Sequence, residues 1–536
     1  MSTREAHREQ IENLALSNRE LRTVLELLRS TPTSTSKHIT EKIREAATLD
    51  EAVSLIADAS VLLPYGPDPA SISPNPLRLR FPDLVQAVAQ PWPLRCNGIS
   101  VISSELPMSR WTSVVKDDRL LTHLLTLFWT WDQVVIRILN QVAFLEELYS
   151  NPDSDVQYCS RFLVNAILAV ATLHLGEKDI HDSSIDARSL GRRFAGQAYR
   201  QFQTTERARP SLTVMQGLTF LWLFESVCGH KARATAVSRP LLELYDVVKT
   251  GHSTAPGERL LREWRDNPTV AWGFGCFGKR IGMALHRGLG ATPIEYPARG
   301  ILAASDMPDL SDLPTQTEDR PWVPYPISTQ LRPSYSPEML AAERSFLVLT
   351  EKVASAIEND DQGVISDASA DDSSLHRLCD RVRDWKAQLP HHIQVNTGTL
   401  PSITHLMVAY ELLMLRILST FSTDNLDVRF SVYAAASSLI THLWTHRAAY
   451  GPRPDYWLAQ ACITATAIIF MGLPDSVRPP NDTVLRAMQL AREAADRLPA
   501  ARGLLVGLRS RLRRAGIRLP NLWADMLSAL EEGRAE

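Results

Sequence analysis

Clustered cysteines are absent from this sequence. Its six cysteines are spread along 536 residues, at Cys96, Cys159, Cys228, Cys276, Cys379 and Cys462. Such spacing excludes a local cysteine-rich metal site within the chain. Reduced thiols in the cytosol or nucleus explain it better than a disulfide framework does. The sequence therefore predicts a chain without disulfides and without a bound metal.

The sequence also lacks a long uninterrupted apolar run and an excess of charge of either sign. Its start, MSTREAHREQ, is charged and has no apolar stretch behind it, so it does not resemble a secretory signal. The most apolar segment, Tyr456–Leu473, is short and interrupted by Gln460, which predicts a buried helix rather than a membrane span. The net charge of −3 gives no bulk attraction to phosphate, so a DNA contact would need a local basic patch.

Nucleotide-binding and catalytic motifs are incomplete. The segment Gly273–Lys279 (GFGCFGK) matches GxGxxG and most of a GxxxxGK loop, but Arg280 replaces the Ser or Thr that holds magnesium. We therefore predict that this segment belongs to a tightly packed helix. His442 and His446 lie one helical turn apart without a nearby third ligand, which predicts core or surface histidines rather than a metal pair. No catalytic residue and no cofactor are expected.

The first thirty residues carry the clearest periodic pattern in the chain. Apolar positions, with one asparagine among them, recur at alternating intervals of three and four residues: Ile11, Leu14, Asn18, Leu21, Leu25 and Leu28. This spacing predicts a coiled-coil dimerisation helix over residues 1–30, and a lone Asn at an a position favours a parallel pair. The flanking e and g positions carry no complementary charges. A single amphipathic helix that packs on its own domain is therefore the alternative.

Residues 31–115 are a predicted proline-rich linker with one amphipathic helix, at about His38–Leu63. Nine prolines fall between Pro64 and Pro107, a density that blocks long helices. Beyond Trp111 helical periodicity dominates and the alternation typical of strands is scarce, so the sequence predicts an all-α fold. Helices are expected at about 120–149, 156–175, 189–206, 212–228, 239–249, 374–389, 404–422, 432–446, 457–470, 484–498 and 501–515, with a further stripe from Phe346 to Ile357. Residues 306–336 and the acidic residues 358–374 are expected to be loops, the second of them mobile.

Seven segments, in order, resemble the middle homology region of the fungal zinc-cluster transcription factors. The most telling is YCSRFLVNAILAVATLHL, because a YCS-(F/L)LxNAILAxA helix follows an aromatic-rich helix in that family. The segments are Trp129–Ser150, Tyr158–Leu175, Leu212–Gly229, Ala271–Gly288, Pro321–Pro326, Asp384–Pro390 and His405–Leu418. Within the second of them, the deeply placed Asn165 would need a buried hydrogen-bond partner.

The resemblance implies a multi-helical regulatory domain behind the coiled-coil helix. Residues 116–330 would be the homology region and residues 331–536 the C-terminal half of the same domain. It also implies a nuclear transcription regulator of a metabolic or secondary-metabolite gene cluster, acting as a homodimer or with a cluster-bearing relative. Its further partner would be the transcription machinery, with no membrane contact.

This sequence departs from the family pattern at one point. Family members usually begin with six cysteines in Cys-x2-Cys-x6-Cys repeats, which hold two zinc ions and read DNA, and this sequence starts at the coiled coil instead. Zinc is therefore expected only if an upstream cysteine cluster is missing, and DNA contact only indirectly or through such a segment. A truncated gene model, a regulator without the cluster and a family fold put to another use are the three explanations.

The C-terminal stretch is basic and amphipathic. Arg509, Arg511, Arg513 and Arg514 alternate with leucines, so they are candidate contacts for phosphate or for nuclear import. The more common explanation is a solvated face whose long side chains cover the core.

A second functional class is a helical domain that binds or converts a small molecule. A polar pocket without an acid–base pair would favour sensing. A buried His or carboxylate with a shifted pKa inside such a pocket would favour an enzyme.

Overall fold

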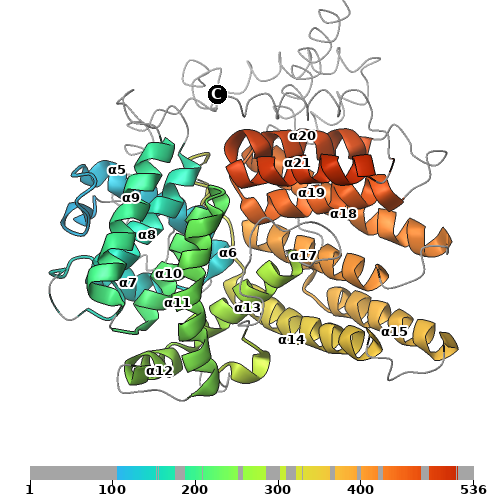
Figure 1. The fold of residues 1–536 in the computed structure, drawn as a ribbon, viewed down its shortest axis with the longest axis horizontal. Coiled ribbons are helices and arrows are strands. Elements are labelled where there is room, and N and C mark those ends of the chain that lie inside the picture. The colour runs from blue at the N-terminus through green and yellow to red at the C-terminus, as the bar shows by residue number, and fades with distance from the viewer. Residues whose placement is uncertain are drawn as a thin grey trace, which may run out of the picture. The chain divides into compact units, whose positions relative to one another are not determined.

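Helices and the turns between them make up the computed structural model shown in Figure 1. It describes residues 105–152, 154, 156–175, 187–207, 209–251, 257–284, 302–308, 321–328, 330–361, 368–394, 400–419, 426–472, 482–514 and 516. Among these residues 79% are helical and no strand is present. Trp322 and Arg332 form an isolated antiparallel bridge. The prediction of an all-α fold is confirmed.

The predicted coiled-coil helix and nearly all of the predicted linker lie outside the described residues. The chain divides into two compact units, Met1–Arg80 and Phe81–Glu536. Every helix described below belongs to the second unit. The dimerisation residues therefore stay a prediction from sequence.

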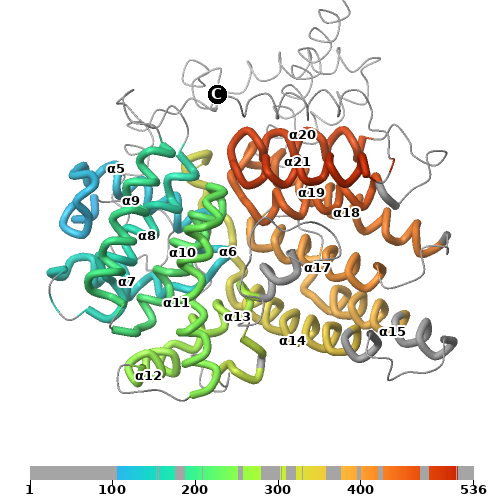
Figure 2. Tube along the Cα trace, in the orientation of Figure 1, coloured from blue at the N-terminus to red at the C-terminus, as the bar shows by residue number. Residues whose placement is uncertain are grey.

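The first set of helices packs around α8 and α10. Their bounds are α5 (Asp118–Phe128), α6 (Val134–Ile136), α7 (Gln141–Glu147), α8 (Arg161–Ala171), α9 (Ala187–Gln201), α10 (Leu212–Val227), α11 (Lys231–Thr250) and α12 (Glu258–Asp266). α8 contacts α5, α9 and α10, and α10 also packs on α11 (Figure 2). The hydroxyls of Ser160 and Ser211 cap α8 and α10 by accepting from the amides of Leu163 and Val214. Every residue of α10 is buried, so this helix is the centre of the set.

The second set of helices is layered. Its bounds are α13 (Pro268–Ala284), α14 (Ser336–Asp361), α15 (Ala368–Ala387), α16 (His391–Gln394), α17 (Pro401–Leu418), α18 (Leu426–Tyr450), α19 (Tyr456–Gly472), α20 (Asp482–Arg497) and α21 (Pro499–Arg514). In Figure 1 α17 lies between α14 and α18, and α19 lies between α18 and the pair α20 and α21. The two sets join where α6 packs on α13 and α17 and where α10 meets α21. Most of their buried side chains form one hydrophobic core, and Trp272, Cys276 and Leu347 form a small separate cluster.

Among the described residues one helix has the length and composition of a membrane span. Pro401–Leu418 is long and apolar enough to span a bilayer, but 94% of it is buried inside the protein. The segment Tyr456–Phe470 is a shorter apolar helix that packs in the core. The sequence prediction of a buried helix there is confirmed.

Two sequence predictions of local structure were wrong. The helix expected over residues 120–149 is broken, because α5 passes into a five-residue π-helix at Trp129–Gln133 and α6 ends at Arg137 in the left-handed region (φ 54°). The expected loop over residues 358–374 is partly helical, because α14 continues to Asp361 and α15 begins at Ala368. Alanines favour helix, and acidic side chains near a helix start are stabilised by its dipole.

Candidate functional site

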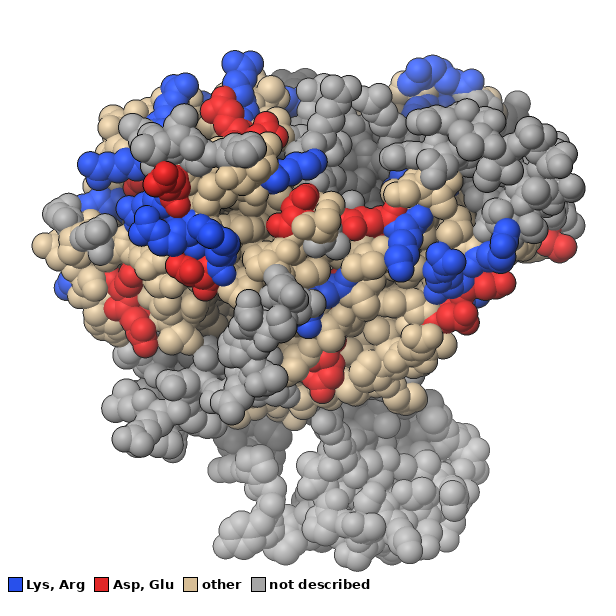
Figure 3. Space-filling view, turned by 90° about the horizontal axis from the view of Figure 1, so that it is seen from below, with Lys and Arg blue, Asp and Glu red and all other residues tan. Residues whose placement is uncertain are grey.

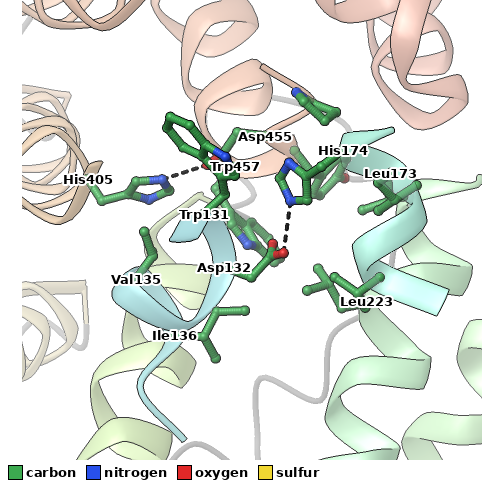
Figure 4. A pocket seen from close by; sticks show the side chains of 14 residues that line it. Trp131, Asp132, Val135, Ile136, Leu173, His174, Leu223, His405, Asp455 and Trp457 are labelled. Carbon is green, nitrogen blue, oxygen red and sulfur yellow. Dashed lines mark hydrogen bonds and ion pairs between the residues drawn. The ribbon is translucent and has the colours of Figure 1, made fainter. Parts of the chain in front are cut away.

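A cavity with mostly apolar walls and two Asp–His pairs lies where the two sets of helices meet. One wall comes from the π-helix, α6, α8, the short helix Thr172–His174 and α10, and the other from α17 and the start of α19 (Figure 4). Its volume is about 30 Å³, room for roughly two water molecules. The lining residues are Trp131, Asp132, Val135, Ile136, Val170, Leu173, His174, Leu223, Val227, His405, Pro454, Asp455, Tyr456 and Trp457.

The first polar element of the cavity is the pair Asp132–His174. The π-helix places Asp132 on the inner wall, and the short helix after α8 carries His174. The His174 Nε2 atom lies 2.8 Å from an Asp132 carboxylate oxygen. Burial raises the pKa of Asp132, and His174 only partly opposes that shift. A π-helix inserts one residue into the helical repeat and is frequent at functional sites.

The second polar element is the pair Asp455–His405. His405 projects from α17, and its Nε2 atom lies 2.7 Å from an Asp455 carboxylate oxygen. The other oxygen accepts from the Leu458 amide at 3.0 Å, so Asp455 also caps α19. Burial raises the pKa of Asp455, but His405 and the Leu458 amide outweigh it and lower the pKa to about 2. Asp455 is therefore ionised at neutral pH.

His446 lies behind the second pair and is buried with it. Burial lowers the pKa of His446 to about 4, and although Asp455 opposes this shift, His405 and Arg453 add to it. His446 is consequently neutral at pH 7. Its ring packs edge-on against Tyr450 at 5.1 Å.

An aromatic frame fixes the cavity walls. Trp131, Trp322 and Tyr450 pack edge-to-face on one another with centroids 5.3 to 5.6 Å apart. The Trp131 ring nitrogen donates to the Tyr325 carbonyl at 2.8 Å, and Arg453 stacks on the same ring at 4.2 Å. These contacts join segments of the chain that are far apart in sequence, so the walls form only in the complete fold.

Two buried polar atoms of the lining have no hydrogen-bond partner among the described residues. They are Nδ1 of His174, whose side chain is 5% exposed, and the hydroxyl of Tyr456, which is 2% exposed. Burial raises the pKa of the Tyr456 hydroxyl. Buried polar atoms are nearly always satisfied in folded proteins, by protein groups or by ordered water, so these two atoms are candidate contacts for water or a bound molecule.

The four arginines singled out in the sequence all lie on α21 but face different surroundings. Arg509 is 9% exposed and Arg511 is half-buried, whereas Arg513 and Arg514 are exposed. Burial lowers the pKa of Arg511, and the nearby Arg514 adds to that shift. The set is therefore split between a covering and a solvated role. On the face shown in Figure 3, the basic side chains of the described residues stand in small groups with acidic ones between them.

The glycine-rich segment forms part of α13, as the sequence analysis predicted. A Cβ at Gly273 would overlap the Arg137 carbonyl, so this glycine permits the close approach of α13 to the end of α6.

His442 and His446 lie on α18, and His442 Nε2 is 3.8 Å from a carboxylate oxygen of the buried Glu411. Within the described ranges no three His, Cys, Asp or Glu side chains form a group able to hold a metal.

The cysteines do not fit a zinc cluster. The five that the structure describes form no disulfide, and all but the half-buried Cys228 are buried in the core. Burial raises the pKa of Cys228 and of Cys462 to about 12, so neither is a ready thiolate ligand or nucleophile. Cys96 lies outside the described residues.

Sequence reasoning missed the cavity. Asp132, His174, His405 and Asp455 are separated by up to hundreds of residues, and no motif links them. The available signal was weaker: each lies within or beside an otherwise apolar segment, where a charged or titratable side chain needs a partner.

The prediction that Asn165 has a buried hydrogen-bond partner is confirmed. Asn165 is fully buried, accepts from the Thr112 hydroxyl at 2.7 Å and donates to the Arg161 carbonyl at 2.7 Å.

Comparison with known proteins agrees with the resemblance noted in the sequence. Residues 125–240 match the fungal specific transcription factor domain, which covers the π-helix and α6 to α10 and so supplies the first wall of the cavity. Over these residues the chain is similar to that domain, and over a longer stretch it is similar to fungal transcription factors.

The relatives in question are longer than this chain. It is 23% identical over 452 residues to the nitrogen assimilation transcription factor nit-4 of Neurospora crassa, covering 80% of this chain and 40% of the relative. The nitrogen assimilation transcription factor nirA of Emericella nidulans is 23% identical, over 59% of this chain and 35% of its own length. The notoamide biosynthesis transcriptional activator notL' of Aspergillus versicolor is 32% identical, over 26% of this chain and 22% of its own length. No solved structure matched.

Proposed function

We propose that this chain is the regulatory part of a nuclear transcription regulator. The observation that carries the proposal is the match of residues 125–240 to the fungal specific transcription factor domain, with similarity to nit-4 extending over 80% of the chain. The names of the relatives favour control of a nitrogen-assimilation or secondary-metabolite pathway. Such a role needs partners: a second copy or a cluster-bearing relative to reach DNA, and the transcription machinery. Zinc would be bound only by a cysteine cluster outside this sequence.

An enzymatic function is the weaker alternative. The cavity does contain carboxylates with shifted pKa values, the feature that was expected to favour an enzyme. However, its volume of about 30 Å³ leaves no room for a substrate of more than a few atoms. Each carboxylate is hydrogen-bonded to an imidazole, and no nucleophilic Ser or Cys is among the lining residues that the structure describes. The relatives are named as transcription factors, which points away from an enzyme.

A recruitment assay tests the proposed function. The full chain is fused to an unrelated DNA-binding domain and directed to a reporter of intermediate basal activity, so that activation and repression are both visible. We expect reporter expression to change at least about fivefold. A coupling free energy of a few kcal/mol produces a change of this size. The matched controls are the same fusion with Gly503→Ala, which leaves the helical domain intact, and with Gly273→Phe, which disrupts it. An unchanged reporter despite stable nuclear fusion protein would contradict the proposal.

A further inference from the structure

We propose that the cavity between Asp132 and Asp455 binds a small cation that donates hydrogen bonds, of the class of ammonium or a short primary amine. Cation binding can be measured on the purified chain, so its test does not depend on the proposed transcriptional role. Bound in this place, the cation would contact both the fungal specific transcription factor domain and the C-terminal helices.

The hydrogen-bonding pattern of the lining calls for a donor. Nε2 of His174 faces the Asp132 carboxylate, so in the neutral imidazole the proton sits on Nε2 when Asp132 is ionised. Nδ1 is then an acceptor, and it is the buried ring atom without a partner. The Tyr456 hydroxyl is the second unpartnered atom and can accept as well. An N–H donor in the cavity would supply the partner that each of these acceptors lacks.

The charge around the cavity calls for a cation. Asp132 and Asp455 line it from opposite walls, as Figure 4 shows, and their side chains remain 16% and 23% exposed. A ligand that enters from solvent therefore passes carboxylates, which repel anions. Burial raises the pKa of Asp132 despite His174, and a cation beside this carboxyl would favour its ionised form. Arg453 stacks on the Trp131 ring and is not one of the lining residues.

The size of the cavity limits the class further. A volume of about 30 Å³ admits one or two non-hydrogen atoms with their hydrogens. Ammonium and methylammonium meet this limit, and amino acids or nucleotides do not. The apolar walls, among them Val135, Leu173 and Leu223, would surround the carbon of a methylated amine.

Thermal unfolding of the full chain tests the proposal. The melting temperature is measured in rising ammonium chloride and methylammonium chloride, each against potassium chloride at equal ionic strength. Potassium is the decisive control because it is close to ammonium in size and charge but has no hydrogen to donate. We expect a saturable rise of about 1–2 °C at ligand concentrations near ten times Kd, with ammonium or methylammonium but not potassium.

Two variants assign the effect to the cavity. Asp132→Asn should abolish the ammonium-specific rise, and Tyr456→Phe should weaken apparent affinity at least about threefold. The Tyr456 hydroxyl has no partner, so Tyr456→Phe should fold with an unchanged or higher melting temperature in potassium chloride. Asp380→Asn, at an exposed site on α15, is the matched control and should keep the full rise.

Three results would overturn the proposal. The first is an equal rise with potassium, which would mean general ionic stabilisation. The second is a rise that persists in both Asp132→Asn and Tyr456→Phe. The third is no rise specific to ammonium or methylammonium up to about 1 M, about ten times the Kd that the affinity ceiling of a ligand with one non-hydrogen atom allows, which would mean that the cavity holds water alone.

Discussion

Gly273 of α13 lies directly against the backbone carbonyl of Arg137, the left-handed residue that ends α6. Any side chain at position 273 would collide with main-chain atoms, which cannot rotate away as a side chain could. This contact ties the segment after the π-helix to the helix that leads into the C-terminal half. We predict that Gly273→Ala lowers the free energy of unfolding by about 1–3 kcal/mol, as measured by urea denaturation.

Gly503 supplies the matched control for that substitution. Nothing lies within 4 Å of the position of its Cβ on α21. Gly503→Ala should therefore stabilise the protein by about 0.5–1 kcal/mol, the usual helix-propensity gain. Equal effects of the two substitutions would show that α13 can move away from Arg137.

Asp455 bonds to His405 and also caps α19, and two substitutions distinguish these interactions. Asn keeps an oxygen for the Leu458 amide but removes the charge that faces His405, whereas Ala removes both. We predict a loss of about 1–3 kcal/mol for Asp455→Asn and about 1 kcal/mol more for Asp455→Ala. Chemical denaturation at pH 7 measures both. Asp482→Asn, at the exposed start of α20, should change stability by less than about 0.5 kcal/mol.

His446 should make the protein sensitive to mild acid. Its pKa is about 4 in the folded protein, against 6.5 for an ordinary histidine. As pH falls below 6.5 the unfolded chain takes up the proton and the folded chain does not, so stability is lost between pH 6.5 and 4. From pH 7 to pH 5 this single group should cost about 2 kcal/mol.

Comparing urea midpoints at the two pH values isolates that contribution. His446→Phe cannot be protonated and should lose less stability between pH 7 and pH 5 than the wild type does. The substitution His391→Phe, at an exposed histidine, should leave the pH dependence unchanged. An identical pH dependence in His446→Phe and wild type would refute the buried neutral state of this ring.

The coiled-coil pattern predicts a dimer. Leu21→Lys with Leu25→Lys places charge in the predicted apolar seam and should convert a dimer to a monomer in light scattering coupled to size exclusion. The control pair is Leu16→Lys with Thr23→Lys, on the outer face of the same heptads, which should leave the dimer intact. Dimers in both double variants would mean that the helix pairs through another face or not at all.

The arginines of α21 should separate by function. Arg509→Ala should lower the melting temperature, because the buried side chain covers the core with its aliphatic stem. Arg513→Ala with Arg514→Ala should leave the melting temperature unchanged but reduce the nuclear fraction of a fluorescently tagged chain. A tagged double variant that stays fully nuclear would remove these exposed arginines from nuclear import.

Much of the helical framework followed from local pattern. The helix expected at 212–228 is α10, and Asn165 has the buried hydrogen-bond partner that its position required. The break after Phe128 did not follow, because residues 120–149 keep helical periodicity through the π-helix and past Arg137. At the break α13 packs against the carbonyl of Arg137, a contact between residues more than one hundred positions apart that no local pattern shows.

The sequence by itself determined the all-α class, the buried helices and the likeness to fungal regulators, because each depends on the order of residues along a short segment. Only the tertiary structure decided that Asp132, His174, His405 and Asp455 share one cavity. Hydrogen bonds and charge interactions act over a few ångströms in space, regardless of separation along the chain. Local periodicity therefore shows which side chains are buried, but only the packing of the two sets of helices shows which of them meet.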